Sequence, residues 1–180
     1  MTTPTPPLAV FVMGVTGSGK STLGNALAQA WGWPYHDADD YHPTSNVEKM
    51  RAGTPLTDED RAPWLAALHA AAIDAIDEGR GIILGCSALK ESYREMLRGG
   101  RDHIAFLWLD VPEGVLQARM DARKGHFMPA SLLASQIATL ERPTQALRLE
   151  GNQPIEALVE QGTALVVAWQ QQFGADTGRA

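Results

Sequence analysis

Continuous apolar runs separated by longer amphipathic stretches give the chain an alternating pattern. The run at residues 81–87 lies between turn residues and lacks polar alternation, which is typical of a parallel strand buried on both faces. Strands are expected at residues 8–13, 33–37, 81–87, 103–110 and 146–150. Because helical segments fall between these runs, the pattern predicts an α/β fold.

The stretches between the runs have the signals of helices. Apolar side chains recur at helical spacing from Trp64 to Ile76, which indicates a helix face packed on a core. Thr57 precedes several acids and is expected to cap that helix. Other helices are expected from residue 22 to about 32, at 43–52, 88–97, 131–141 and 154–173, and from 112 onward.

The turn after the first apolar run has a glycine-rich phosphate-binding pattern. Lys20 and Ser21 end a Gly-x4-Gly-Lys-Ser sequence, the Walker A spacing in which backbone N–H groups surround phosphates at a helix N-terminus. Lys20 is expected to reach the β- and γ-phosphates, and Ser21 to bind Mg²⁺. Nucleotide contacts are expected at Gly14, Thr16, Gly17, Ser18, Gly19, Lys20, Ser21 and Thr22. The motif alone is compatible with a kinase, a GTPase or an ATPase.

Length and composition restrict the class of protein. The 180 residues, 44% of them hydrophobic, suit one domain with a sheet covered by helices on both faces. A net charge of −6 and a pI of about 5.3 argue against a nucleic-acid-binding surface. Cys86 is the single cysteine, so no internal disulfide can form, and a cytoplasmic location is expected.

The two ends of the chain, residues 1–7 and 174–180, are expected to be flexible tails. No basic segment precedes a long apolar run, so neither a signal peptide nor a membrane span is expected. Residues 1–180 are therefore expected to form a single domain that has no membrane or nucleic-acid partner.

Two carboxylates follow the second predicted strand. Asp37 and Asp39 are two residues apart and would point to opposite sides of an extended chain. A carboxylate at this strand end could accept a proton from an attacking hydroxyl or hold a Mg²⁺-bound water. Alternatively, the acids only cap the helix that follows Pro43.

Basic side chains mark two further places. Ser87, Lys90 and Arg94 lie at or beyond the end of the third strand, the edge where open α/β sheets bind ligands. Arg123 and Lys124 precede a glycine after a helix, which suggests a lid that brings positive charge over a phosphoryl group. The alternative is a basic helix end that interacts with the helix dipole.

Several segments together are similar to the gluconokinase family. They are the Walker A loop, Asp-x-Asp-x-x-His-Pro at 37–43, Ser-Ala-Leu-Lys at 87–90 and Arg-Lys-Gly-His-Phe at 123–127, and the match runs from Gly14 to about Glu141. The resemblance implies ATP- and Mg²⁺-dependent phosphorylation of D-gluconate at its 6-hydroxyl, giving 6-phosphogluconate and ADP for the pentose phosphate or Entner–Doudoroff pathway. It also implies a three-layer P-loop kinase with a five-stranded parallel sheet, shikimate-kinase-like, with a helical lid at about 123–136 and a homodimeric assembly.

The resemblance also suggests roles for single residues. Asp37 would serve the Mg²⁺ shell or proton transfer, and Asp39 and His42 would bind gluconate hydroxyls. Arg119 would lie near adenine, and Arg123 and Lys124 would face the phosphates. Candidates for binding the substrate, chiefly its carboxylate, are Lys49, Arg51, Arg61, Ser87, Lys90, Arg94 and His126. One departure from the family is Glu150, where an Asp is expected before the predicted adenine loop at 150–154.

Three other functions are alternatives to this one. A shikimate or small-nucleotide kinase would share the scaffold. A GTP-binding switch is disfavoured because the chain has no Asn-Lys-x-Asp segment to read guanine. A noncatalytic ATP-sensing module would bind nucleotide without turning over any acceptor.

Overall fold

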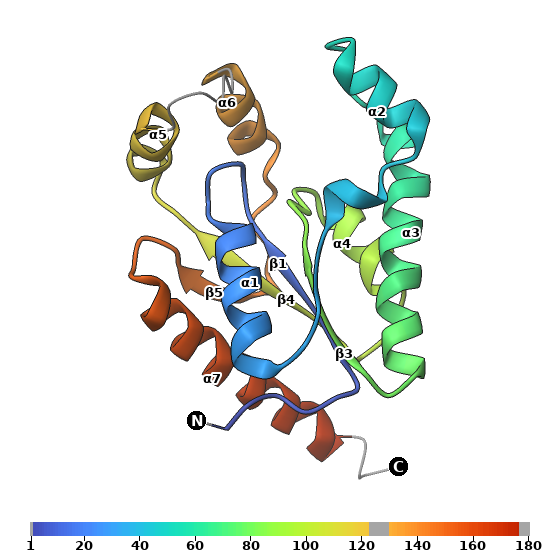
Figure 1. Ribbon diagram of the computed structural model, residues 1–180, viewed down its shortest axis with the longest axis vertical. Helices are drawn as coiled ribbons and strands as arrows, with labels where there is room; N and C mark the ends of the chain where they lie inside the picture. The colour runs from blue at the N-terminus through green and yellow to red at the C-terminus, as the bar shows by residue number, and fades with distance from the viewer. Residues whose placement is uncertain (1, 123–129, 177–180) are drawn as a thin grey trace.

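A parallel sheet of five strands forms the centre of the molecule, in the order β2-β3-β1-β4-β5 (Figure 1). The computed structural model describes residues 2–122 and 130–176. The strands are β1 (Leu8–Met13), β2 (Tyr35–Asp37), β3 (Gly81–Gly85), β4 (Ile104–Asp110) and β5 (Leu147–Glu150). The predicted α/β fold with five parallel strands is confirmed.

Helices cover both faces of the sheet and extend beyond its carboxyl edge (Figure 1). Helices α1 and α7 pack on one face, and α3 and α4 on the other. The helices are α1 (Lys20–Trp31), the 3-10 helix η1 (Ala38–Tyr41), α2 (Thr44–Arg51), α3 (Asp58–Asp77), α4 (Glu91–Arg98), α5 (Glu113–Ala122), α6 (Ala130–Thr139) and α7 (Ile155–Asp176). Within the described ranges, no helix is long and apolar enough to cross a membrane.

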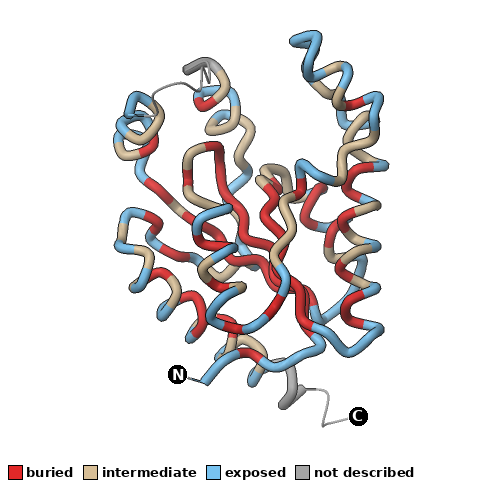
Figure 2. Tube along the Cα trace, in the orientation of Figure 1, coloured by how far each residue is buried: buried red, intermediate tan, exposed pale blue. Residues whose placement is uncertain are grey.

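Strand β1 is buried along its whole length (Figure 2), and each of its six residues is 0% exposed. Its even-numbered side chains pack against α1 and α7, and its odd-numbered side chains pack against α3 and α4. Phe11 pairs with Leu84 of β3 and with Phe106 of β4, and the two phenyl rings stack with centroids 5.3 Å apart. This double burial explains why the sequence of β1 is a continuous apolar run.

A smaller apolar cluster lies beyond the carboxyl edge of the sheet. It joins Val15, from the turn after β1, to Val111, to Leu116 of α5 and to Leu133 of α6. Helices α5 and α6 therefore stand beside the turn after β1, at the top of Figure 1. Helix α2 projects away from the sheet at the same end of the molecule.

The ends of some elements differ from the sequence predictions. Helix α4 begins at Glu91 and not at residue 88, because Ala88 has a left-handed backbone with φ 45° and interrupts the helical path. Helix α7 continues to Asp176, beyond the predicted end at residue 173. The expected amino-terminal tail is attached to α7, where Thr5 N–H donates to Gln170 Oε1 at 3.0 Å and Gln170 donates back to the Thr5 carbonyl.

Thr57 caps α3 as predicted. Its hydroxyl accepts the Asp60 N–H at 3.2 Å, and the Asp60 carboxylate accepts the Thr57 N–H at 3.0 Å. These reciprocal bonds form a capping box, which satisfies two backbone donors at the start of the helix.

Gly24 in α1 is required by the close approach of Tyr35. A Cβ at position 24 would lie 2.2 Å from Cε2 of the Tyr35 ring. Replacing glycine by alanine inside a helix is usually stabilising. At position 24, however, we expect Gly24→Ala to lower the free energy of unfolding by about 1–3 kcal/mol, because the added methyl group overpacks the site. Urea denaturation measures this change. Gly114→Ala is the control, because a Cβ at position 114 meets no heavy atom within 4 Å. This variant should be more stable than the parent by up to about 1 kcal/mol. A stabilised Gly24→Ala variant would contradict the packing.

Candidate active site

The turn between β1 and α1 forms the predicted phosphate loop. β1 ends at Met13, and α1 begins at Lys20 after Gly19, whose left-handed φ of 101° lets the chain turn sharply into the helix. The first N–H groups of α1 have no partner within the helix and point into the loop, which is the usual arrangement of an anion site. Lys20 Nζ lies across the loop and donates to the Val15 carbonyl at 3.1 Å.

The interior of this loop suits phosphate oxygens. Among the described residues, Ser18 Oγ is the buried side-chain oxygen or nitrogen without a hydrogen-bond partner. A Cβ at Gly14 would lie 2.8 Å from that hydroxyl, whereas a Cβ at Gly19 would meet no heavy atom within 4 Å. The predicted nucleotide-binding residues Thr16, Gly17, Ser18 and Gly19 lie in the loop, with Lys20, Ser21 and Thr22 in the first turn of α1.

Ser21 and Asp37, the two residues expected to bind Mg²⁺, come together at the carboxyl edge of the sheet. The Ser21 hydroxyl donates to Asp37 Oδ2 at 3.2 Å, and the Tyr35 hydroxyl donates to the same oxygen at 3.4 Å. Asp37 also caps η1, because its Oδ1 accepts the Asp39 N–H at 3.0 Å. Hydroxyl and carboxylate oxygens are ligands that Mg²⁺ prefers, so Ser21 and Asp37 could hold this ion.

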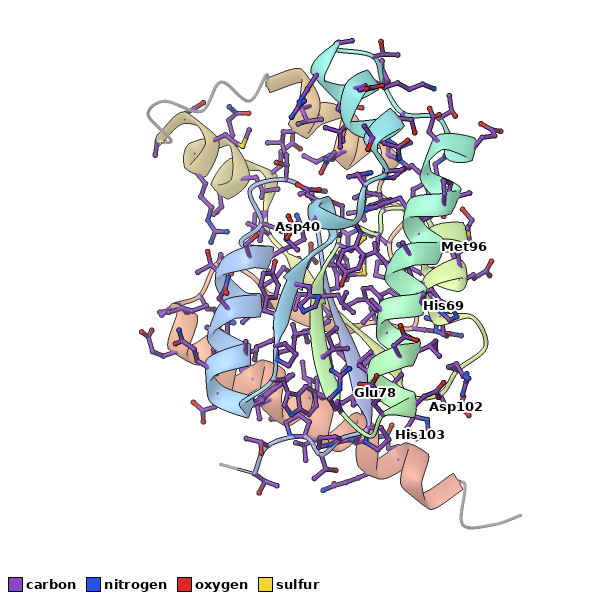
Figure 3. All side chains as sticks on the ribbon, turned by 45° about the vertical axis from the view of Figure 1, so that its right-hand side comes forward. Asp40, His69, Glu78, Met96, Asp102 and His103 are labelled. Carbon is purple, nitrogen blue, oxygen red and sulfur yellow. The ribbon has the colours of Figure 1, made fainter. Side chains whose placement is uncertain are left out.

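Asp39 lies in η1, just after β2, and its side chain is exposed. Partial loss of hydration raises the pKa of its carboxyl group, and the neighbouring Asp37 carboxylate raises it further. The Lys20 ammonium opposes this increase in pKa, as does the His42 imidazole when it is protonated. Figure 3 shows the adjacent Asp40 at this end of the sheet, far from Asp102 at the opposite end.

His42 is held by an aromatic contact. Its ring stacks on the Trp64 indole with centroids 4.4 Å apart, and Trp64 Nε1 donates to the Ala38 carbonyl at 2.7 Å. Asn46 Nδ2 lies 3.3 Å from His42 Nδ1. Burial lowers the pKa of His42, although the Asp39 carboxylate opposes that change. A neutral imidazole can both donate and accept hydrogen bonds, as recognition of a hydroxyl requires.

Two predicted lysines of the substrate site form ion pairs with acids of α3. Lys90 Nζ lies 2.9 Å from Asp58 Oδ2, and the Tyr93 hydroxyl donates to Asp58 Oδ1 at 2.5 Å. Arg61 lies 4.0 Å from the same carboxylate. Lys90 and Arg61 therefore converge on one place, between α3 and the start of α4.

The other predicted lysine lies beside this cluster, on α2. Lys49 Nζ contacts both carboxylate oxygens of Asp60, at 2.7 and 2.8 Å. Arg51 is exposed at the last residue of α2. Ser87 is half-buried just after β3.

Arg94 differs from the expectation that it contacts the substrate. Its side chain is only 1% exposed, and its guanidinium donates to the Glu91 carboxylate and to the carbonyls of Ala88, Leu89 and Glu141. These bonds hold the turn that leads from β3 to Lys90. The guanidinium is thus directed into the protein.

Arg119 connects the phosphate loop to the predicted adenine loop. Its guanidinium donates to the Ser18 carbonyl at 3.0 Å and to the Gly151 carbonyl at 2.8 Å. The remaining predicted residues, Arg123, Lys124 and His126, lie outside the described residues, and the predicted lid is described only from residue 130 onward.

Several residues of the site were not identified from the sequence. The sequence pattern indicates only that Asp58 and Asp60 are acids in the first turn of a helix and that Trp64 is a core residue, whereas the structure places them against Lys90, Lys49 and His42. Their partners lie 11 to 32 residues away along the chain, so the sequence gives no local signal for these contacts. Gln136, whose Oε1 accepts the Thr16 N–H at 2.6 Å, gives no sequence signal because it is an ordinary helix residue.

The chain matches known proteins over most of its length. Residues 16–149 match the sequence profile of the family described as Shikimate kinase. The gluconokinase of Gluconobacter oxydans (strain 621H) is 48% identical over 158 residues, which cover 86% of this chain and 89% of that protein. The thermosensitive gluconokinase of Escherichia coli (strain K12) is 42% identical over 165 residues, which cover 89% and 88%. The crystal structure of a gluconokinase from Sinorhizobium meliloti 1021 has a TM-score of 0.83 at 40% identity and covers 94% of this chain and 97% of that chain.

The sheet order, the phosphate loop and the shikimate kinase profile define a P-loop kinase. Within that class, identities of 42–48% over most of both chains decide the family. The chain belongs to the gluconokinase family, and the resemblance inferred from its motifs is confirmed.

The Asp58–Lys90 pair should make stability depend on pH in a defined direction. Hydrogen bonds from Tyr93 and Lys90 lower the pKa of Asp58, and the bond to Asp58 raises the pKa of Lys90. The stabilisation is thus present between the two pKa values, is lost as the pH falls through that of Asp58, and is lost as the pH rises through that of Lys90. The difference in Tm between the parent and Asp58→Asn should therefore be largest near neutral pH. Asp102→Asn is the control, and a difference for Asp58→Asn that does not change with pH would argue against the pair.

Proposed function

We propose that the protein transfers the γ-phosphoryl group of ATP to the 6-hydroxyl of D-gluconate, with 6-phospho-D-gluconate and ADP as products. The observation on which the proposal depends is the contact between Ser21 and Asp37, because it joins the phosphate loop to the acidic strand end. Membership of the gluconokinase family supports gluconate as the acceptor.

In the proposed mechanism the residues of the site position the reactants and neutralise charge. Lys20 and the N–H groups at the start of α1 stabilise negative charge on the phosphoryl oxygens. Asp39 accepts the proton of the attacking hydroxyl, and its raised pKa makes it a better base than an ordinary aspartate. His42, stacked on Trp64, binds a second hydroxyl of the acceptor.

Ser21 and Asp37 are the residues that would hold Mg²⁺. When bound, this ion would supply further charge neutralisation on the phosphate oxygens. Arg119 would contact the nucleotide base, which its bonds to both the phosphate loop and the loop after β5 support.

The carboxylate of the acceptor would bind where Lys90 and Arg61 converge, with Lys49 nearby. Charge-assisted hydrogen bonds from such groups are stronger than neutral ones. Arg94 would act indirectly, because its bonds hold the backbone that leads to Lys90.

Family membership alone supports the remaining proposals. The chain would form one kinase domain, work as a cytoplasmic homodimer and supply the pentose phosphate or Entner–Doudoroff pathway. Arg123, Lys124 and His126 would belong to a lid at about 123–136.

Release of ADP from Mg·ATP tests the reaction directly. D-gluconate should support turnover, whereas shikimate, glucose and AMP should not. Turnover with one of those acceptors and not with gluconate would support the assignment as a kinase but contradict D-gluconate as its acceptor. Binding of ATP without turnover of any acceptor would favour a nucleotide-sensing role.

Lys20→Ala should reduce kcat by about 100-fold or more, because a preorganised charge on the transferred group is lost. Circular dichroism and Tm would show that the variant remains folded. Arg101→Ala removes an exposed cation before β4 and should leave kcat unchanged. Parent-like turnover by folded Lys20→Ala would exclude the proposed role of the loop.

Lys90→Met should raise the KM for D-gluconate about 10- to 100-fold, as expected for losing a hydrogen bond to a charged group. Its KM for ATP should stay near the parent value, since Lys90 lies on the acceptor side. Steady-state kinetics with each substrate varied in turn measures both constants. Equal changes in the two KM values would point to a general structural defect.

A further inference from the structure

Helix α6 and the residues after it connect the two sides of the proposed site. At one end, Gln136 Oε1 accepts the Thr16 N–H of the phosphate loop at 2.6 Å. Leu133 of the same helix packs in the cluster that contains Val15. A backbone N–H that is bonded to Gln136 is not free to bind phosphate, so Gln136 supports the wall of the loop from outside.

The other end of this segment is fastened to the acceptor side. The Glu141 N–H donates to the Leu89 carbonyl at 2.8 Å, and the Glu141 carboxylate accepts the Glu91 N–H at 2.6 Å. Arg94 donates to the Glu141 carbonyl at 2.9 Å. All of these bonds surround Lys90, which precedes α4 as its N-cap residue.

The turn before Lys90 depends on these contacts. Ala88 has a φ of 45°, a left-handed conformation that is unfavourable for a residue with a Cβ. The buried Arg94 guanidinium donates to the carbonyls of Ala88 and Leu89 at 2.7 and 3.2 Å. The position of Lys90 is therefore set by Arg94 and Glu141.

We infer that the segment from Gln136 to Glu141 couples the nucleotide and acceptor sites, with Gln136, Glu141 and Arg94 as positioning residues. A nucleotide that fixes the phosphate loop also fixes Gln136, and through α6 it fixes Glu141 and the turn before Lys90. By linkage, binding at either site then tightens binding at the other by the same factor. This inference rests on the proposed function, since it takes D-gluconate as the second ligand.

Titration calorimetry with D-gluconate, with and without a saturating nonhydrolysable ATP analogue and Mg²⁺, tests the coupling. In the parent, the analogue should tighten gluconate binding at least about fivefold, the lower end of common coupling factors. In Gln136→Met, which keeps the volume but loses the acceptor oxygen, this factor should fall to within about twofold of one. A residue with only a structural role would change the affinities and leave the factor intact.

Two further variants complete the experiment. Glu141→Ala changes an exposed side chain and should also reduce the coupling factor, which keeps the test open if Gln136→Met does not fold. Glu95→Ala, which changes an exposed glutamate of α4 outside the proposed site, should keep the parent factor.

The outcomes separate the inference from the proposed function. If the parent binds both ligands without coupling, or if both Gln136→Met and Glu141→Ala keep the parent factor, the inference is overturned and the proposed function stands. If the parent binds the nucleotide analogue but no gluconate, the proposed substrate and the coupling are both overturned.

Discussion

Burial of both faces of β1 determines where this protein can do chemistry. All six residues of the strand are buried, and its backbone pairs with β3 on one side and β4 on the other. Polar groups are costly in such an environment unless they are hydrogen-bonded. Only beyond Met13, where pairing ends and the chain turns into α1, can N–H groups face a ligand. The neighbouring strands β2 and β3 end at the same edge, which gathers Asp37 and the turn before Lys90 around the loop.

The cations on the acceptor side are already paired with acids of α3. Lys49 contacts Asp60 and Lys90 contacts Asp58, both within 3 Å. These pairs hold the long, flexible lysine side chains in defined positions. The aspartate carboxylates also compete with any anionic ligand for the same lysines. In the proposed function, an incoming carboxylate would therefore interact with a partly neutralised cluster. Its affinity then depends on the difference between its own hydrogen bonds and those it displaces, which favours a ligand whose hydroxyls make further contacts.

How far the sequence predicts this site follows from the distance between interacting residues along the chain. The phosphate loop is a contiguous segment, so its spacing and its flanking elements suffice to predict it. The pairing of Lys90 with Asp58 spans 32 residues, and that of Thr16 with Gln136 spans 120. No local pattern encodes such contacts. The left-handed turn at Ala88 is also hidden, because alanine is a strong helix former and the sequence predicts a helix from that residue. The role of Arg94 is hidden as well. In the sequence it resembles a free cation, but in the structure it is buried and its hydrogen bonds support this turn.

At the end of β2, one hydrogen bond between Asp37 and Asp39 determines how the two carboxylates are oriented. In an extended chain Asp37 and Asp39 would point to opposite sides. The 3-10 helix that begins at Ala38 changes these directions. The Asp39 N–H donates to Asp37 Oδ1, so the Asp37 side chain caps the helix. The same carboxylate accepts the Ser21 hydroxyl through Oδ2, so the cap also orients Asp37 toward the phosphate loop. Partial loss of hydration raises the pKa of Asp39, the Asp37 carboxylate raises it further, and the Lys20 ammonium lowers it. One capping interaction thus assigns different environments to two identical side chains, and different environments are what the two proposed roles, holding a metal ion and accepting a proton, would require.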